Sequence, residues 1–164
     1  MNFKFNKTFP FLVPFGVLQT SKVFFSITLF IIFICIDKYI NGIEIINTLL
    51  CFFGIFSLLS LTAHIFGLQH NLSDKTDVFC YIPLALLDFF IGVLAAFIYS
   101  IGFILFFISL PELYEYSTKL FFKYFFGGIN CLLLMITYGF YSFKLYLKSP
   151  NQKTIGIKSI IVEA

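Results

Sequence analysis

The chain has 164 residues, of which 60% are hydrophobic and 12% charged, and its formal net charge is +3. A soluble globular domain is about 45–50% apolar, so this composition excludes an ordinary soluble domain. All the basic residues are lysines that lie near the ends of apolar runs or in the terminal segments, so the positive charge does not indicate nucleic-acid binding.

Four long apolar runs follow one another along the chain. A spanning helix needs about 20 mostly apolar residues to cross about 30 Å of hydrocarbon. The first run, Val23–Ile36, is too short by itself and must extend upstream through Lys22. The runs lack the alternation of barrel strands, and helices satisfy every backbone group within lipid. We therefore predict an all-α integral membrane four-helix bundle with spans at about 15–36, 45–68, 80–110 and 121–146.

These spans predict a single transmembrane domain over residues 1–147, followed by a short basic tail, 148–164. Lysines precede or begin the first span and follow the fourth, whereas the middle connection, 69–77, has one lysine and two acids. By the positive-inside rule we expect both termini on the cytoplasmic side. The lysines in question are Lys4, Lys7 and Lys22, then Lys144, Lys148, Lys153 and Lys158.

Aromatic residues make up 21% of the chain, yet tryptophan is absent. We interpret most of the 26 phenylalanines as lipid-facing side chains. Trp and Tyr usually form the interfacial belts of a membrane protein. In this chain we therefore expect tyrosine alone to form these belts. The tyrosines near predicted span boundaries are Tyr39, Tyr81, Tyr114, Tyr116, Tyr124, Tyr141 and Tyr146.

Asp88 is the only acid inside a predicted spanning run. An acid within the membrane is costly and usually faces protein or water. Gly92, Ala96 and Ser100 follow it at intervals of four residues and so share its helix face. Small residues let a neighbouring helix approach closely, which predicts that the third helix is central to the bundle.

In the expected orientation, Lys22 and His64 lie at a depth similar to that of Asp88, with Gln19 one turn before Lys22. Three interpretations stay open. The group is a structural ion pair that orients helices, or Asp88 and Lys22 extend separately to the interface, or the group is a proton or ligand site.

The sequence offers little further chemistry. The fourth helix carries a second small-residue face, Gly127, Cys131, Met135 and Gly139, which predicts packing rather than a pore. The cysteines form no CxxC pair, and the histidines have no acid or cysteine at ligand spacing. No acid–base pair or nucleophile motif is visible. We expect no enzymatic activity, no metal and no cofactor.

The pattern resembles that of MARVEL-type four-helix proteins over residues 14–147. The segment Pro14–Lys22 brings a lysine early into the first helix, and Leu87–Ala96 opens the third helix with an acid and small residues. The fourth helix carries Gly127 and Gly128 and leads into a basic tail. The chain departs from the pattern in its very short first outer connection and in lacking the paired outer cysteines of some relatives. The resemblance implies a non-enzymatic, membrane-organising role in vesicle traffic, membrane apposition or cell junctions.

Three functions follow as hypotheses. The first is lateral association with other membrane proteins, as a homo- or hetero-oligomer, within the plasma membrane or endomembrane vesicles. The second is an accessory subunit of a larger membrane complex, with an organellar membrane as an alternative location. The third is a small transporter or channel that uses Asp88 and Lys22.

Overall fold

The computed structural model describes residues 7–36, 43–66 and 84–148, with the backbone alone at 43–46 and 84. The described residues are helical almost throughout and contain no strand. In chain order the elements are the 3₁₀ turn η1 (Phe9–Phe11) and the helices α1 (Phe15–Ile34), α2 (Ile43–Ile65), α3 (Leu84–Ile108), α4 (Leu110–Tyr116) and α5 (Thr118–Lys148).

Four of these helices, α1, α2, α3 and α5, are long and apolar enough to cross a membrane. The shortest, α1, has 20 residues, and at 1.5 Å per residue it extends about 30 Å, the thickness of the hydrocarbon core. The predicted all-helical class with four apolar helices is confirmed, and it indicates an integral membrane protein. Several predicted features lie outside the described residues. These are the end of the second span at 67–68, the start of the third span at 80–83, the middle connection 69–77 and the tail residues 149–164.

The connection between the third and fourth spans contains a helix of its own, α4. Pro111 lies in its first turn. Proline has no backbone N–H and cannot continue α3, but the first turn of a new helix tolerates it. The chain becomes extended at Ser117 (φ −164°, ψ 119°), and α5 begins at the next residue, earlier than the predicted start at 121.

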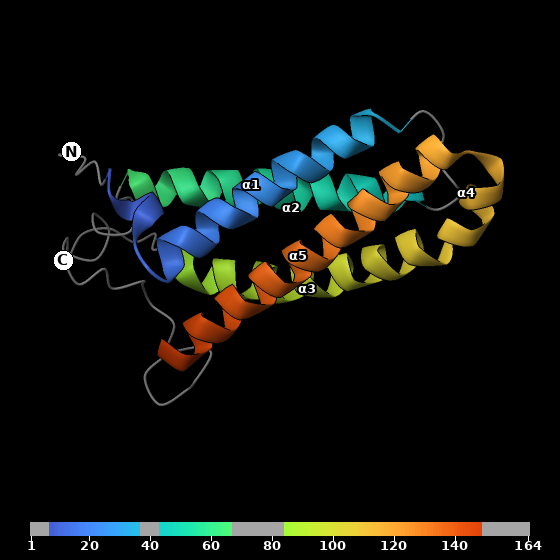
Figure 1. Ribbon diagram of the computed structural model, residues 1–164. Helices are drawn as coiled ribbons and strands as arrows, with labels where there is room; N and C mark the ends of the chain where they lie inside the picture. The colour runs from blue at the N-terminus through green and yellow to red at the C-terminus, as the bar shows by residue number, and fades with distance from the viewer. Residues whose placement is uncertain (1–6, 37–42, 67–83, 149–164) are drawn as a thin grey trace, which may run out of the picture.

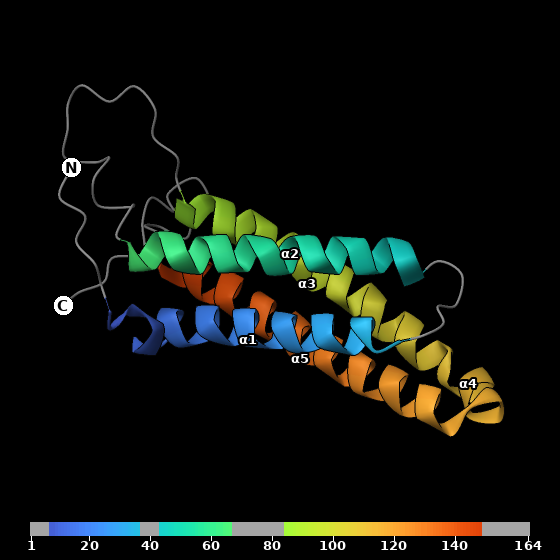
Figure 2. The same cartoon turned by 90° about the horizontal axis from the view of Figure 1, so that it is seen from above.

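The four long helices run antiparallel to their neighbours in the sequence (Figure 1). The beginnings of α1 and α3 and the ends of α2 and α5 lie at one end of the bundle, and α4 lies at the other. Two layers result, one of α1 and α2 and the other of α3 and α5, and the second crosses the first obliquely (Figure 2). Each long helix packs on two others in the cyclic order α1, α2, α3, α5, and the α3–α5 interface is the most extensive.

The middle of the bundle is built around two stacked tyrosines, Tyr99 of α3 and Tyr138 of α5, whose ring centroids are 5.4 Å apart. Both are almost completely buried, so their hydroxyls need partners. Tyr138 donates to the carbonyl of Phe53 (2.9 Å) and accepts from the hydroxyl of Ser57 (2.5 Å). Tyr99 donates to the carbonyl of Leu50 (3.3 Å). The aromatic core thus attaches α3 and α5 to the backbone of α2.

The expected tyrosine belt is wrong for two of its members. Tyr124 and Tyr141 are completely buried, because each lies on the inward face of α5. The Tyr124 ring packs on Phe106 with centroids 5.3 Å apart. Tyr114 and Tyr116 of α4 are each 67% exposed, as an interfacial position requires. Tyr39 and Tyr81 lie outside the described residues.

Two glycines of α5 pack against α3 with different clearance. A Cβ atom on Gly128 would lie 2.7 Å from Cε2 of Phe107, whereas one on Gly139 would meet nothing nearer than the Cβ of Ala96, at 3.9 Å. The two helices are therefore in tight contact at Gly128 and in ordinary van der Waals contact at Gly139.

We predict that Gly128→Ala lowers the free energy of unfolding by ~1–3 kcal/mol, because the Phe107 ring must shift to admit the methyl group. Gly139→Ala is the matched control on the same helix, and it should be neutral or stabilising because alanine is the better helix former. Unfolding in detergent, followed by circular dichroism, measures both. Equal losses in the two variants would contradict the difference in packing.

Candidate functional site

A cluster of buried charged and polar side chains lies at the end of the bundle where α1 and α3 begin. Lys22 lies two turns into α1, His64 in the last turn of α2, Asp88 in the second turn of α3 and Tyr141 two turns before the end of α5. The antiparallel order of the helices brings these four positions to one end (Figure 1). Each of the four spanning helices therefore contributes a side chain to this polar cluster.

The carboxylate of Asp88 is the centre of the polar cluster and is 3% exposed. Ser60 of α2 donates its hydroxyl hydrogen between the two carboxylate oxygens, at 2.7 and 2.8 Å. Tyr141 of α5 donates to Oδ2 at 3.1 Å. A buried carboxylate is costly unless hydrogen bonds and a counter-charge compensate it, and these two donors supply the hydrogen bonds.

His64 faces Asp88 from α2. Its Nδ1 lies 2.7 Å from the carbonyl oxygen of Ser60, and because a carbonyl only accepts, Nδ1 carries a hydrogen. Its Nε2 lies 3.9 Å from Oδ2 of Asp88. Nε2 and the carboxylate attract one another only when a proton is bound to one of them, so this contact is a proton-dependent part of the polar cluster.

Lys22 supplies the positive charge that balances Asp88, and its ammonium lies over the ring of Tyr141. Its ammonium lies 3.4 Å from the ring centroid of Tyr141 and 4.9 Å from that of Tyr138, and the residue is 2% exposed. Among the described residues no direct ion pair joins Lys22 to Asp88. Tyr141 links the two instead, because its ring face binds the cation while its hydroxyl donates to the carboxylate.

The turn η1 closes the polar cluster at this end. Phe9 stacks on the imidazole of His64 with ring centroids 4.9 Å apart, and Thr20 donates to the carbonyl of Pro10 at 3.2 Å. Gly16 makes this close approach sterically feasible, since a Cβ atom there would overlap the carbonyl of Phe9. The polar cluster is therefore covered by protein where the chain enters α1.

Gln19 lies one turn before Lys22 and is completely buried. Its Nε2 donates to the carbonyl of Ser57 at 3.2 Å and so joins α1 to α2. Tyr99 and Tyr138 join α3 and α5 to α2 in the same way. Its Oε1 accepts no hydrogen bond from the described residues.

The structure thus brings Lys22, His64 and Asp88 together. The small residues that follow Asp88 along α3 lie outside this polar cluster. Gly92 lies directly against Ser142 of α5, and Ala96 faces Gly139. Ser100 donates to the carbonyl of Phe97 in its own helix, at 2.6 Å. Close packing between α3 and α5 therefore involves Gly92 and Ala96, whereas the Ser100 hydroxyl is satisfied within α3.

Sequence reasoning missed Ser60, Tyr141 and Phe9 as parts of the polar cluster. Ser60 lies four residues before His64 and so on the same helix face, a signal that was present in the sequence. Tyr141 and Phe9 had no such signal, because their approach to Asp88 and His64 depends on how the elements pack.

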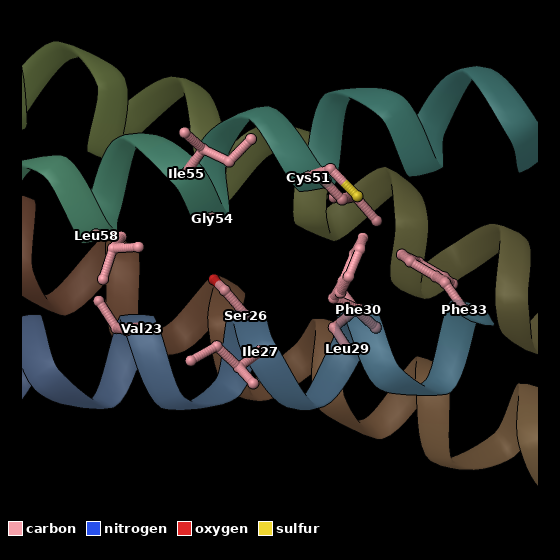
Figure 3. Close-up of a pocket in the computed structure, with 11 residues that line it drawn as sticks. Val23, Ser26, Ile27, Leu29, Phe30, Phe33, Cys51, Gly54, Ile55 and Leu58 are labelled. Atoms are coloured by element: carbon pink, nitrogen blue, oxygen red, sulfur yellow. The ribbon is translucent and has the colours of Figure 1, made fainter. Parts of the chain in front are cut away.

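Two grooves flank α1 on the side of the bundle. The α1–α2 groove has a volume of about 210 Å³, and in it Ser26 points across toward Gly54 of α2 (Figure 3). The α1–α5 groove has a volume of about 540 Å³ and is lined mostly by apolar residues, with Thr28 and Asn130 in its walls and Lys123 at one end. Neither groove is lined by a charged residue of the polar cluster.

The described residues contain no group of three or more His, Cys, Asp or Glu side chains that could hold a metal ion. Comparison with known proteins gives no match to a protein-family model, a curated protein or a solved structure.

We predict that Asp88→Asn lowers the free energy of unfolding by ~3–5 kcal/mol, because it leaves Lys22 buried without a counter-charge. Adding Lys22→Met to that variant should restore part of the loss, since the uncompensated charge is then gone. Unfolding in detergent provides the measurement. An Asp88→Asn protein as stable as the wild type would show that the polar cluster does not hold the helices together.

Proposed function

We propose that the chain is a non-enzymatic multi-pass membrane protein that acts by lateral association, in membrane organisation, vesicle traffic or a cell junction. One observation carries the proposal. The charged groups of the described bundle interior are linked through Tyr141 and covered on the His64 side by Phe9 of η1. The outer surface of the spanning helices, by contrast, is apolar. Other molecules within the bilayer can therefore contact the protein only at its lateral surface.

Several features of the outer surface support this function. Large apolar side chains that are about half exposed or more occur on every spanning helix, for example Phe24, Phe52, Phe97 and Phe126. Two grooves interrupt that surface. The MARVEL-type resemblance over residues 14–147 favours the same class of function.

The proposal includes an orientation with both termini in the cytoplasm, within the plasma membrane or endomembrane vesicles. Lys144 and Lys148 lie near the end of α5, at the same end of the bundle as the polar cluster, and lysines concentrate on the cytoplasmic side of membrane proteins. Protease digestion of a C-terminal tag in sealed vesicles of known orientation tests it, and a protected tag on vesicles with their cytoplasmic face outward would refute it.

We expect an epitope-tagged copy to retain a co-expressed untagged copy, or another membrane protein in fixed ratio, after extraction in a mild detergent. Native mass spectrometry of the purified material measures the composition. Copies mixed only after extraction form the control for association driven by detergent. A fixed ratio to other proteins would favour the accessory-subunit function, and a monomer without stoichiometric partners would contradict lateral association.

A transporter that uses Asp88 and Lys22 is a second candidate. It is favoured by the burial of both charges at one end of the bundle and by Oε1 of Gln19, which accepts no hydrogen bond from the part of the chain that the structure describes. The closed cover over the polar cluster argues against it. We expect proton flux in reconstituted vesicles to equal that of protein-free vesicles, for both the wild type and Asp88→Asn. Flux that the wild type supports and Asp88→Asn lacks would establish the transporter instead.

A further inference from the structure

The turn η1 has two sides with opposite surroundings. Phe9 and Leu12 are three residues apart, which is one turn of a 3₁₀ helix, and so they share a side. Both pack against apolar side chains of α1 and α2, and Phe9 is 1% exposed. Phe11 and Val13, the exposed pair, are 81% and 83% exposed, more than any other large apolar side chain that the structure describes.

The turn lies beside the first turns of α1 at the end of the bundle (Figure 1). Thr20 donates to the carbonyl of Pro10 at 3.2 Å, and a Cβ atom on Gly16 would overlap the carbonyl of Phe9. Gly16 and Thr20 lie within about 8 Å of the beginning of α1 along the helix axis. The exposed pair is therefore at the depth where α1 begins, on a part of the chain that packs along the side of that helix.

Two observations place this depth at the boundary of the hydrocarbon core. The helix α1 is about 30 Å long, which equals the thickness of the core, so its beginning coincides with one boundary. Independently, the ammonium of Lys148 lies 5.0 Å from the ring centroid of Phe15, the first residue of α1. Lysines near the ends of spanning helices extend their ammonium groups to the interface. Headgroups and the ends of acyl chains meet at this level.

From the exposure, the position beside α1 and the depth together, we propose that Phe11 and Val13 form a membrane-interface anchor. They insert among the phospholipids of the leaflet at this end, where headgroups meet acyl chains. Interfacial segments bury their apolar side chains about 5–10 Å into this region. The inference goes beyond the proposed function and needs only that the four helices span a bilayer.

The size of the exposed pair favours lipid over a protein partner as its neighbour. Two side chains offer far less than the about 800 Å² that each partner buries in a stable protein interface. Phospholipid, in contrast, surrounds the protein at this depth whatever the protein assembles with.

The anchor also bears on the polar cluster. Phe9 and the exposed pair project from opposite sides of one short segment, and Phe9 stacks on the imidazole of His64. Lipid that holds the exposed pair therefore holds Phe9 in place over His64. The cover of the polar cluster is thus fixed by protein on its inner side and by lipid on its outer side.

The chain contains no tryptophan, so a single introduced tryptophan reports on its own surroundings. Phe11→Trp and Val13→Trp place it in the exposed pair. Phe24→Trp is the control for depth, because the native side chain is 65% exposed and lies about 14 Å along α1, near the middle of the bilayer. Each variant is reconstituted in vesicles of phosphatidylcholine that carries bromine, a quencher of tryptophan, near either the headgroup end or the methyl end of the acyl chain.

We expect Phe11→Trp and Val13→Trp to lose most of their fluorescence with bromine near the headgroup end and little with bromine near the methyl end. Phe24→Trp should show the reverse order. Absence of quenching by either lipid would overturn the proposal, because water, a second copy or another segment of the chain would then surround the exposed pair. Stronger quenching from the methyl end would also overturn it, because the pair would then lie within the hydrocarbon core.

Amide hydrogen exchange in vesicles tests whether lipid holds the cover. The N–H of Leu12 donates to the carbonyl of Phe9 at 3.0 Å, so its exchange reports the opening of η1. We expect Phe11→Ser combined with Val13→Ser to quicken this exchange about tenfold, because the exposed pair then gains little from lipid. Phe11→Leu combined with Val13→Ile keeps the pair apolar and should exchange at the wild-type rate.

Equal exchange in the serine variant and the wild type would overturn the role of lipid in holding the cover. None of these results depends on whether the chain associates laterally, so the proposed function stands or falls separately.

Discussion

The burial of one carboxylate constrains the whole bundle. Asp88 places a negative charge in the interior of the bundle. Each neighbouring helix supplies a hydrogen-bond donor or a positive charge that compensates it. Ser60 and Tyr141 donate hydrogen bonds from α2 and α5, and Lys22 of α1 supplies a positive charge through the ring of Tyr141. The requirement to compensate one acid therefore fixes the mutual rotation of all four helices at this end.

Farther along the bundle the same principle operates with neutral groups. Tyr138 and Tyr99 bond to carbonyls of α2, Gln19 bonds to another, and Asn130 joins α5 to α1. Lipid supplies no hydrophobic force between helices, so polar contacts and close packing of small residues must select the neighbours. The bundle uses both, with polar contacts in its interior and glycines between α3 and α5. Its polar groups are thereby directed inward, and its side is left apolar, which is why the proposed function concerns that side.

The grooves on the two flanks of α1 show how one lysine distinguishes otherwise similar surfaces. Both are apolar and both open on the side of the bundle. Only the α1–α5 groove has a charge at its end, and that charge is held by the carbonyl at the end of α1. The same contact joins the last turn of α1 to α5, so packing between helices and the charge beside the groove depend on one side chain.

The amino-acid sequence by itself determined the helical class, the four apolar helices and the residues Lys22, His64 and Asp88 as a candidate group, because run length and isolated charges within apolar runs are properties of the chain alone. It did not determine which face of each helix is buried. Lipid is as apolar as the interior of the bundle, so hydropathy does not show which face of a spanning helix is buried. Tyr124 and Tyr141 were therefore expected at the membrane surface, although both are buried against other helices. Only the tertiary structure decided that Ser60 and Tyr141 meet Asp88, that Phe9 covers His64 and that grooves flank α1, since each of these depends on the rotation and crossing of packed helices.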